Sequence, residues 1–177
     1  MLRRLDRYSD IDKRKLMDLY AEGNRENAAE FYPDEDPKIG VEKVERECLA
    51  FLKDGFMPKP ENSYWVLEQD GVYLSALRLT ELPDRLFYLE ALETHPDHRR
   101  NGHAVELLKK VTDALKKDGP FRICDCVGKR NTASVKAHEK AGFSIVSEQG
   151  YDYLSGEAGD RHYGLEYVYQ DEQEEVR

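Results

Sequence analysis

The sequence predicts a mixed α/β fold in which helices flank a central, mostly antiparallel sheet of about six to seven strands. Three observations support this prediction. Two segments rich in β-branched and aromatic residues, 64–68 and 72–77, enclose Asp70-Gly71, a strong hairpin signal. A long amphipathic segment, 101–117, lies directly between two further strand-like segments. Gly142 follows a second helical pattern at the position where helices commonly end.

The N-terminal third predicts one weak strand and three helical pieces. Ser9-Asp10 can cap a helix that starts near Ile11, and Gly23-Asn24 is expected to interrupt the helical pattern. Two prolines within 32–37 restrict the backbone and predict a second interruption. We therefore expect a strand over 2–8 and helices from residue 11, over 25–31 and over 41–52.

The remaining elements alternate between strand and helix. A connection over 81–84 leads into a strand over 86–94, which completes an antiparallel meander with the two hairpin strands. The strands before and after the helix over 101–117 are expected to run parallel, since a helix joins them. The later elements are expected over 121–127 (strand), 131–141 (helix), 143–146, 151–154 and 162–169 (strands). One domain over 1–169 and an acidic, frayed tail over 170–177 complete the prediction.

Composition limits the class of protein. The 177 residues suit one domain, 40% are hydrophobic, and no apolar run approaches the ~20 residues that span a bilayer. Residues 1–6 lack the apolar core of a secretion signal, so we expect a cytoplasmic protein. Cys48, Cys124 and Cys126 are expected to be small core residues without a disulfide or a metal.

The formal net charge of −9 disfavours nucleic acid as a partner, because phosphate contacts need a basic surface. The same charge mildly favours cationic small molecules.

The segment 95–104 carries the strongest functional signal, because it joins a strand directly to a long amphipathic helix. Backbone N–H groups at a helix start lack helical partners and bear the positive end of the dipole, so they can bind an anion such as phosphate. Gly102 lets the chain turn and lets a phosphate approach, while Arg99 and Arg100 add positive charge. A strand-helix turn with solvated arginines is the alternative. His95, His98 and His103 are interpreted as loop residues and not as metal ligands.

Two sequence landmarks resemble those of the GNAT superfamily of N-acetyltransferases. Arg99-x-x-Gly102-x-Ala104 is similar to the family signature Arg/Gln-x-x-Gly-x-Gly/Ala, and the lead-in from Leu92 to Arg99 also resembles the family, with Thr94 where Val or Ile is more usual. Residues 131–143 resemble the second landmark, which has Asn at a helix start, an aromatic residue seven positions on and a closing Gly-Phe. The order of landmarks and elements matches the family over nearly the whole chain.

This resemblance implies a GNAT fold, acetyl-CoA as cosubstrate and no metal. It implies that Leu92 and Thr94 pair through their backbone with the pantetheine arm. Asn131, with Ser134 on the same helix, would contact the pantetheine or phosphate end. The pyrophosphate would lie on the loop made of Arg99, Arg100, Asn101, Gly102, His103 and Ala104.

The position of His138 departs from the family pattern, in which Tyr is frequent and often serves as general acid for the CoA thiolate. The resemblance implies that His138 lies near the thioester sulfur. Three roles are open for it: a proton donor with a raised pKa, a hydrogen-bond partner of the sulfur, or none, if the thiolate leaves unaided. A packed, hydrogen-bonded core histidine is the alternative.

The acceptor amine must lose a proton, and a carboxylate near the acyl carbon can take it. Glu90 and Glu93 lie on the strand that should face the acetyl group, and they point to opposite faces unless a bulge intervenes. We favour Glu90, because it shares a face with Leu92 and Thr94 on a regular strand. A solvated carboxylate is the alternative for either residue.

The predicted activity is transfer of an acetyl group to a primary amine, chiefly of a small molecule. A protein N-terminus or lysine is the second acceptor class. An acyl-CoA sensor without turnover, and a structural or toxin-partner protein that uses only the fold, are the non-enzymatic alternatives. Dimers are frequent in such families, although no segment marks an interface. Aromatic and acidic residues in the expected acceptor region suit a cationic amine: Tyr20, Glu22, Glu26, Glu30, Phe31, Tyr32, Asp34, Tyr151, Tyr153 and Tyr163.

Overall fold

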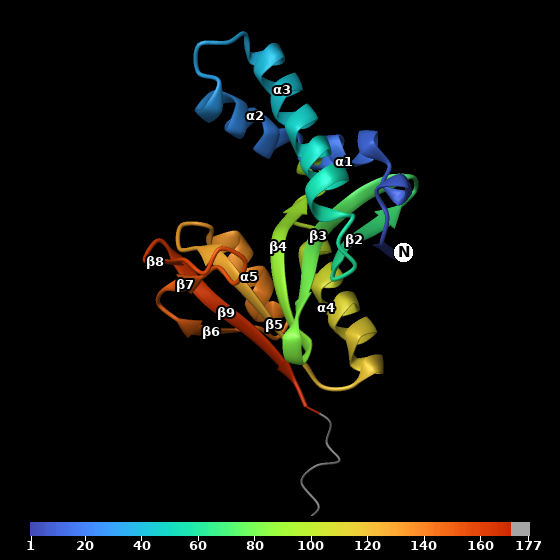
Figure 1. Ribbon diagram of the computed structural model, residues 1–177, viewed down its shortest axis with the longest axis vertical. Helices are drawn as coiled ribbons and strands as arrows, with labels where there is room; N and C mark the ends of the chain where they lie inside the picture. The colour runs from blue at the N-terminus through green and yellow to red at the C-terminus, as the bar shows by residue number, and fades with distance from the viewer. Residues whose placement is uncertain (171–177) are drawn as a thin grey trace, which may run out of the picture.

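A seven-stranded, mostly antiparallel sheet forms the centre of the protein in the computed structural model, which describes residues 1–170 (Figure 1). This confirms the predicted fold class; the predicted tail lies outside the described residues except for Gln170. The strand order is β1-β2-β3-β4-β5-β9-β6, and β7 and β8 pair separately. The strands are β1 (Leu2–Leu5), β2 (Asn62–Gln69), β3 (Val72–Leu82), β4 (Leu86–Thr94), β5 (Phe121–Gly128), β6 (Ser144–Ser147), β7 (Gly150–Tyr151), β8 (Ala158–Gly159) and β9 (His162–Tyr169).

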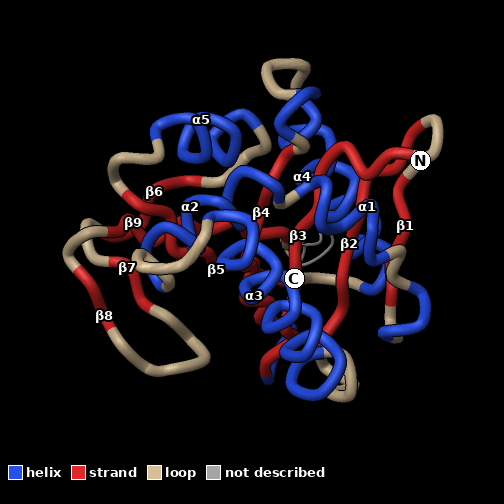
Figure 2. The backbone as a smooth tube through the Cα atoms, turned by 90° about the horizontal axis from the view of Figure 1, so that it is seen from above, coloured by secondary structure: helices blue, strands red, loops and turns tan. Residues whose placement is uncertain are grey.

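Helices cover both faces of the sheet (Figures 1 and 2). On one face, α4 (His103–Leu115) and α5 (Thr132–Lys140) enclose a core centred on Leu77, Leu107 and Ile123. On the other face, α1 (Lys13–Leu19) covers a second core around Leu16, together with the π turn Phe51–Phe56. The helices α2 (Ala21–Phe31) and α3 (Pro37–Ala50) form a hairpin beside α1. No helix within residues 1–170 is long and apolar enough to cross a bilayer.

The N-terminal helices differ in detail from the prediction. Asp12, and not Ser9-Asp10, caps α1, because its side chain accepts from the N–H of Lys15 at 3.2 Å. Gly23-Asn24 does not break the pattern but lies inside α2. Asn24 is buried there, so packing outweighs the weak helix propensity of Gly and Asn.

The central strands follow the prediction closely. Asp70 and Gly71 take φ values of 50° and 80°, as a tight hairpin turn requires, and β2, β3 and β4 form the expected antiparallel meander. β4 and β5 run parallel on either side of α4 in the chain, also as expected. The strand predicted over 151–154 is wrong beyond Tyr151. Asp152 instead accepts from the N–H groups of Leu154 and Ser155, which makes a local turn.

An extra residue interrupts β4 and changes which side chains share a face. Ala76 pairs with Glu93 but Arg78 pairs with Glu90, so β4 carries one residue more than β3 over this stretch. Ala91, within the interruption, has a φ of 54°, which is the left-handed region. Pairing between β4 and β5 ends just before it, at Leu89 and Asp125. Beyond that point β4 is free of β5, and the two halves of the sheet spread apart (Figure 1).

We expect Leu107→Ala to lower the free energy of unfolding by about 2–5 kcal/mol, because Leu107 is fully buried and its loss leaves a cavity under α4. Urea unfolding measures the change. Ile39→Ala, at a position that is 47% exposed, should change it by less than about 0.5 kcal/mol. Equal losses in the two variants would contradict the assignment of the core.

Candidate active site

A groove of about 950 Å³ runs between the end of β4, the start of α4 and one face of α5. It brings together residues that the sequence analysis proposed for cofactor binding: Leu92, Thr94, Arg99, Arg100, Gly102, His103, Ala104, Asn131 and Ser134. Asn101 does not line the groove; its side chain donates to the carbonyl of His98 at 3.1 Å and holds the loop. The groove thus joins the two sequence landmarks, and their role in binding stays a prediction.

The start of α4 presents backbone N–H groups to this groove. Gly102 occupies the cap position with a φ of 80° and makes no side-chain cap. The first helical hydrogen bond runs from Glu106 N–H to Gly102 O, so the three preceding N–H groups, of residues 103–105, have no partner within the helix. Arg100 also has a positive φ, of 63°. Alternating backbone conformations of this kind turn successive N–H groups toward one anion.

Arg99 does not extend freely into the groove, because two carboxylates hold its guanidinium. It forms an ion pair with Glu22 on α2, and a second with Glu93 at 3.3 Å. Glu93 also accepts from the N–H of Thr94 at 2.9 Å. The side chain of Arg99 therefore ties the loop to the acceptor side, whereas the neighbouring backbone faces the groove.

The helix α5 supplies the opposite wall. Asn131 caps this helix by accepting from the N–H of Ser134 at 3.1 Å, which leaves its NH₂ group as the donor for a ligand. Lys136 and Lys140 also line the groove, and the sequence analysis missed them. Their spacing of four residues, one helical turn apart and on the side of Ala133 and Ala137, is the signal that could have found them.

His138 lies outside the groove and is fully buried. Its Nδ1 donates to the carbonyl of Ser134 at 2.8 Å, and its Nε2 lies 2.9 Å from Oδ2 of Asp125 on β5. Its ring packs edge-on against Phe143. Both nitrogens face protein groups and no atom is exposed, so this geometry favours the alternative, a core histidine, over contact with a thioester sulfur.

The bulge at Ala91 places Glu90 and Glu93 on the same face of β4. Their partners Ala76 and Arg78 are two residues apart on β3, and side chains of paired residues point to the same side. Thr94 pairs with Ser75 and therefore faces the other way. The expectation that Glu90 shares a face with Thr94 and Leu92 was wrong, because it assumed a regular strand; Leu92 packs against the core under α4.

Glu90 occupies a half-buried position on the face covered by the N-terminal helices. Burial raises the pKa of its carboxyl, and the Arg78 guanidinium, 3.7 Å away, acts in the opposite direction. Asp152 and Asp125 add smaller contributions that raise the pKa further. A carboxyl whose pKa is raised in this way is a better proton acceptor than an ordinary glutamate.

Two tyrosines connect the N-terminal helices to the bulge. Tyr20, between α1 and α2, donates from its hydroxyl to the carbonyl of Ala91 at 2.6 Å. Tyr64 on β2 donates to the Tyr20 hydroxyl at 2.8 Å. Tyr20 was expected in the acceptor region, whereas no sequence signal pointed to Tyr64.

Other residues expected near the acceptor lie in three different places. Glu22 and Glu26 line the groove. Tyr153 packs its ring 5.8 Å from that of Tyr88 and approaches Cys124, on the same face as Glu90. Tyr163 packs instead against the core under α4.

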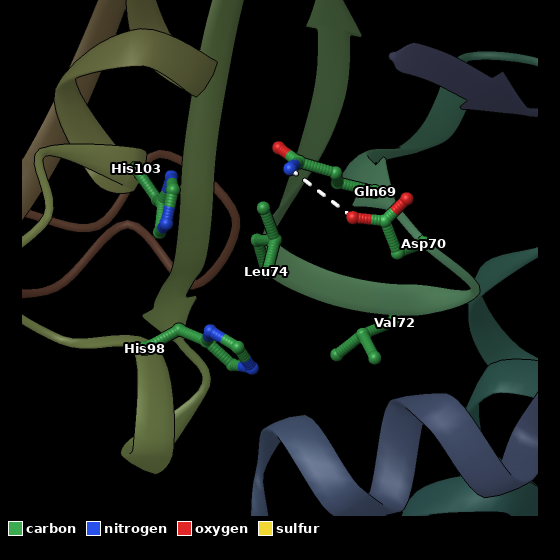
Figure 3. A pocket seen from close by; sticks show the side chains of 6 residues that line it. All are labelled: Gln69, Asp70, Val72, Leu74, His98 and His103. Carbon is green, nitrogen blue, oxygen red and sulfur yellow. Dashed lines mark hydrogen bonds between the residues drawn. The ribbon is translucent and has the colours of Figure 1, made fainter.

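A second, smaller cavity of about 140 Å³ lies between the β2–β3 turn and the start of α4 (Figure 3). His98 and His103 face it beside Leu74 and Val72, and Gln69 and Asp70 bond to each other at its edge. Among residues 1–170, no group of three or more His, Cys, Asp or Glu side chains is arranged to hold a metal ion.

The Asp125–His138 contact should be visible as an energetic coupling. We expect His138→Phe and Asp125→Ala each to lower the free energy of unfolding by about 3 kcal/mol or more, since each leaves a buried polar partner unpaired. The double variant should lose less than the sum, by at least about 1 kcal/mol, in urea unfolding. Additive losses would show that the two side chains do not interact.

Comparisons with known proteins agree with this geometry. A family model described as the acetyltransferase (GNAT) family matches residues 16–143. A search among curated proteins finds no match to the sequence. Among solved structures, the PaiA N-acetyltransferase of Thermoplasma acidophilum, in complex with coenzyme A, is 15% identical with a TM-score of 0.60, over 96% of this chain and 99% of that chain.

Two further structures share the fold at low identity. The Salmonella typhimurium protein yncA, with its cofactor acetyl-CoA, is 17% identical with a TM-score of 0.53, over 97% of this chain and 94% of that chain. The Escherichia coli ribosomal-protein-S18-alanine N-acetyltransferase is 20% identical with a TM-score of 0.53, over 67% of this chain and 76% of that chain. Since the family model covers well over half of the sequence, the chain belongs to the acetyltransferase (GNAT) family and is an acyltransferase enzyme with a GNAT fold.

Proposed function

We propose that the protein transfers an acetyl group from acetyl-CoA to a primary amine of a small molecule. The observation that carries the proposal is the continuous groove from the N–H groups at the start of α4 to the bulge in β4, where β4 leaves β5. A phosphate end bound at the helix directs the rest of a long, thin cofactor along β4. The PaiA and yncA structures, which hold coenzyme A and acetyl-CoA, support this choice of cofactor.

Charge in the groove matches the cofactor's phosphates. The cations available for these phosphates are Arg100, Lys136 and Lys140, which line the groove. The guanidinium of Arg99 is instead paired with two carboxylates, those of Glu22 and Glu93. The backbone of Leu92 and Thr94 borders the path of the pantetheine arm, which can pair with it as an added strand does.

In the proposed reaction, the amine and its base Glu90 lie on one face of β4, and Thr94 lies on the other. The free amine attacks the thioester carbon, the C–S bond breaks, and the products are an amide and the CoA thiolate. Glu90 takes the amine proton, directly or through water, from the face opposite Thr94. A thiol with an ordinary pKa of about 8.5 is a good leaving group near neutral pH, so departure does not require His138.

The acceptor proposal rests on charge. Glu22, Glu26 and Glu93 line the groove, and Glu90 lies on the same face of β4 as Glu93. The chain also carries a net charge of −9, which favours a cation. CoA release from acetyl-CoA should be measured with spermidine, cadaverine, tyramine, free lysine and a peptide with an unblocked N-terminus. Release with the small amines supports the proposal. Release with the peptide alone would replace it by a protein acceptor, and CoA binding without any release would indicate a sensor.

Gly102→Glu should lower the affinity for CoA at least about 100-fold, because the carboxylate stands where a phosphate would bind. Gly102→Ala is the matched control. Both substitutions bear the left-handed backbone cost of about 1–2 kcal/mol, and a Cβ at this position meets no atom within 4 Å. Calorimetric titration with CoA should show a much smaller loss of affinity for alanine than for glutamate. Wild-type affinity in Gly102→Glu would refute the assignment of the phosphate site.

Glu90→Gln should lower turnover by a factor of about 10² or more and should remove the acidic limb of the pH-rate profile. The active form of Glu90 is deprotonated, so the wild-type rate falls as pH drops through its raised pKa, which burial holds above the ordinary range of a glutamate. Steady-state kinetics from pH 5 to 9 provide the measurement. Glu93→Gln is the control and should keep the acidic limb of the profile. If the limb disappears in Glu93→Gln and persists in Glu90→Gln, Glu93 is the base.

A further inference from the structure

Backbone orientation at the bulge determines where one particular N–H group points. The peptide that joins Ala91 to Leu92 is trans, as are all peptide bonds in the described chain. In a planar trans peptide the C=O and N–H point in opposite directions. The carbonyl of Ala91 points at the hydroxyl of Tyr20, so the N–H of Leu92 points away from the N-terminal helices. Leu92 itself lines the groove.

We propose that Tyr20, supported by Tyr64, is a positioning residue that fixes the Ala91–Leu92 peptide so that the N–H of Leu92 faces the thioester oxygen. The inference rests on the proposed function for the identity of the group that this N–H meets. A backbone N–H held toward a developing oxyanion stabilises the transition state more than the bound substrate. Tyr20 touches no reacting atom in this scheme and acts only through the peptide.

Three backbone features indicate that regular sheet pairing does not fix the Ala91–Leu92 peptide. Ala91 has a Cβ and yet adopts a φ of 54°, a conformation that non-glycine residues resist. The register shift occurs at this point, and pairing with β5 has already ended at Leu89. The 2.6 Å bond from Tyr20 is thus a specific restraint on a peptide that regular sheet pairing does not fix.

The hydroxyl of Tyr20 is itself fixed by a hydrogen bond from Tyr64. Tyr64 is buried in the core under α1, and it donates to Tyr20, so the proton of Tyr20 is directed to Ala91. Burial raises the pKa of Tyr20, which keeps its hydroxyl a donor over the working range of pH. Tyr64 pairs with Arg78, and Arg78 pairs with Glu90, which places Tyr64 and the proposed base on one face.

The first test uses the free protein and needs no substrate. In Tyr20→Phe, backbone ¹⁵N relaxation dispersion should show new exchange on the microsecond-to-millisecond scale at Leu92, where the wild type shows none. Tyr73→Phe is the matched control. Tyr73 lies in the same core, is fully buried, and its hydroxyl accepts from Asp12 N–H at 3.2 Å, away from the bulge. An unchanged Leu92 signal in Tyr20→Phe, or an equal change in Tyr73→Phe, overturns the inference.

The second test separates positioning from general stability. With acetyl-CoA and the most active of the five acceptors named above, Tyr20→Phe should lower kcat about 10- to 100-fold and leave the KM for acetyl-CoA within twofold. Tyr64→Phe should give a smaller loss, and Tyr73→Phe should keep the wild-type kcat even where its melting temperature falls. A wild-type kcat in Tyr20→Phe overturns the inference while the proposed function stands. If the wild type releases no CoA with any acceptor, the proposed function fails, and the Leu92 signal still decides whether Tyr20 holds the peptide.

Discussion

Ala91 has a left-handed backbone in the middle of a strand, and three features of the site depend on that one residue. The extra residue brings Glu90 and Glu93 to one face. It lies just past the last pair between β4 and β5, where the sheet opens beside the groove. It also turns a carbonyl toward Tyr20 and the following N–H the other way. On a regular strand, Glu90 and Glu93 would point to opposite faces.

Electrostatics divide the site along the same strand. Carboxylates gather on the acceptor side, and lysines and helical N–H groups gather on the side expected to hold phosphates. Arg99 lies between them and is neutralised by Glu22 and Glu93. The guanidinium and the two carboxylates therefore form one ion-pair network at the border between the two sides.

Local signals explain which parts the sequence could predict. The hairpin at Asp70-Gly71, the strand over 86–94 and the long helix α4 each carry their own pattern of turn residues or apolar spacing, and all three were predicted. The bulge carries no such pattern: Ala91 is not glycine, and a single inserted residue is invisible without its partner strand. The burial of His138 depends on Asp125, thirteen positions earlier on another element, and no motif encodes that contact. Contacts between residues on different elements cannot be predicted from local sequence patterns.

The N-terminal helices were the least accurately predicted elements, and yet they hold the strand that carries the site. Tyr20 ends α1 and begins α2, so its hydroxyl links the helix pair that shapes the acceptor region to the backbone at Ala91. Glycine at position 91 would remove a cost of about 1–2 kcal/mol but would also free the peptide to rotate. Alanine at position 91 allows fewer backbone conformations than glycine, and the hydrogen bond from Tyr20, supported by Tyr64, stabilises one of them. Because Glu22 and Glu26 of α2 line the groove, changes in this helix alter the groove wall directly, whereas the bond from Tyr20 to Ala91 lies at the junction of α1 and α2.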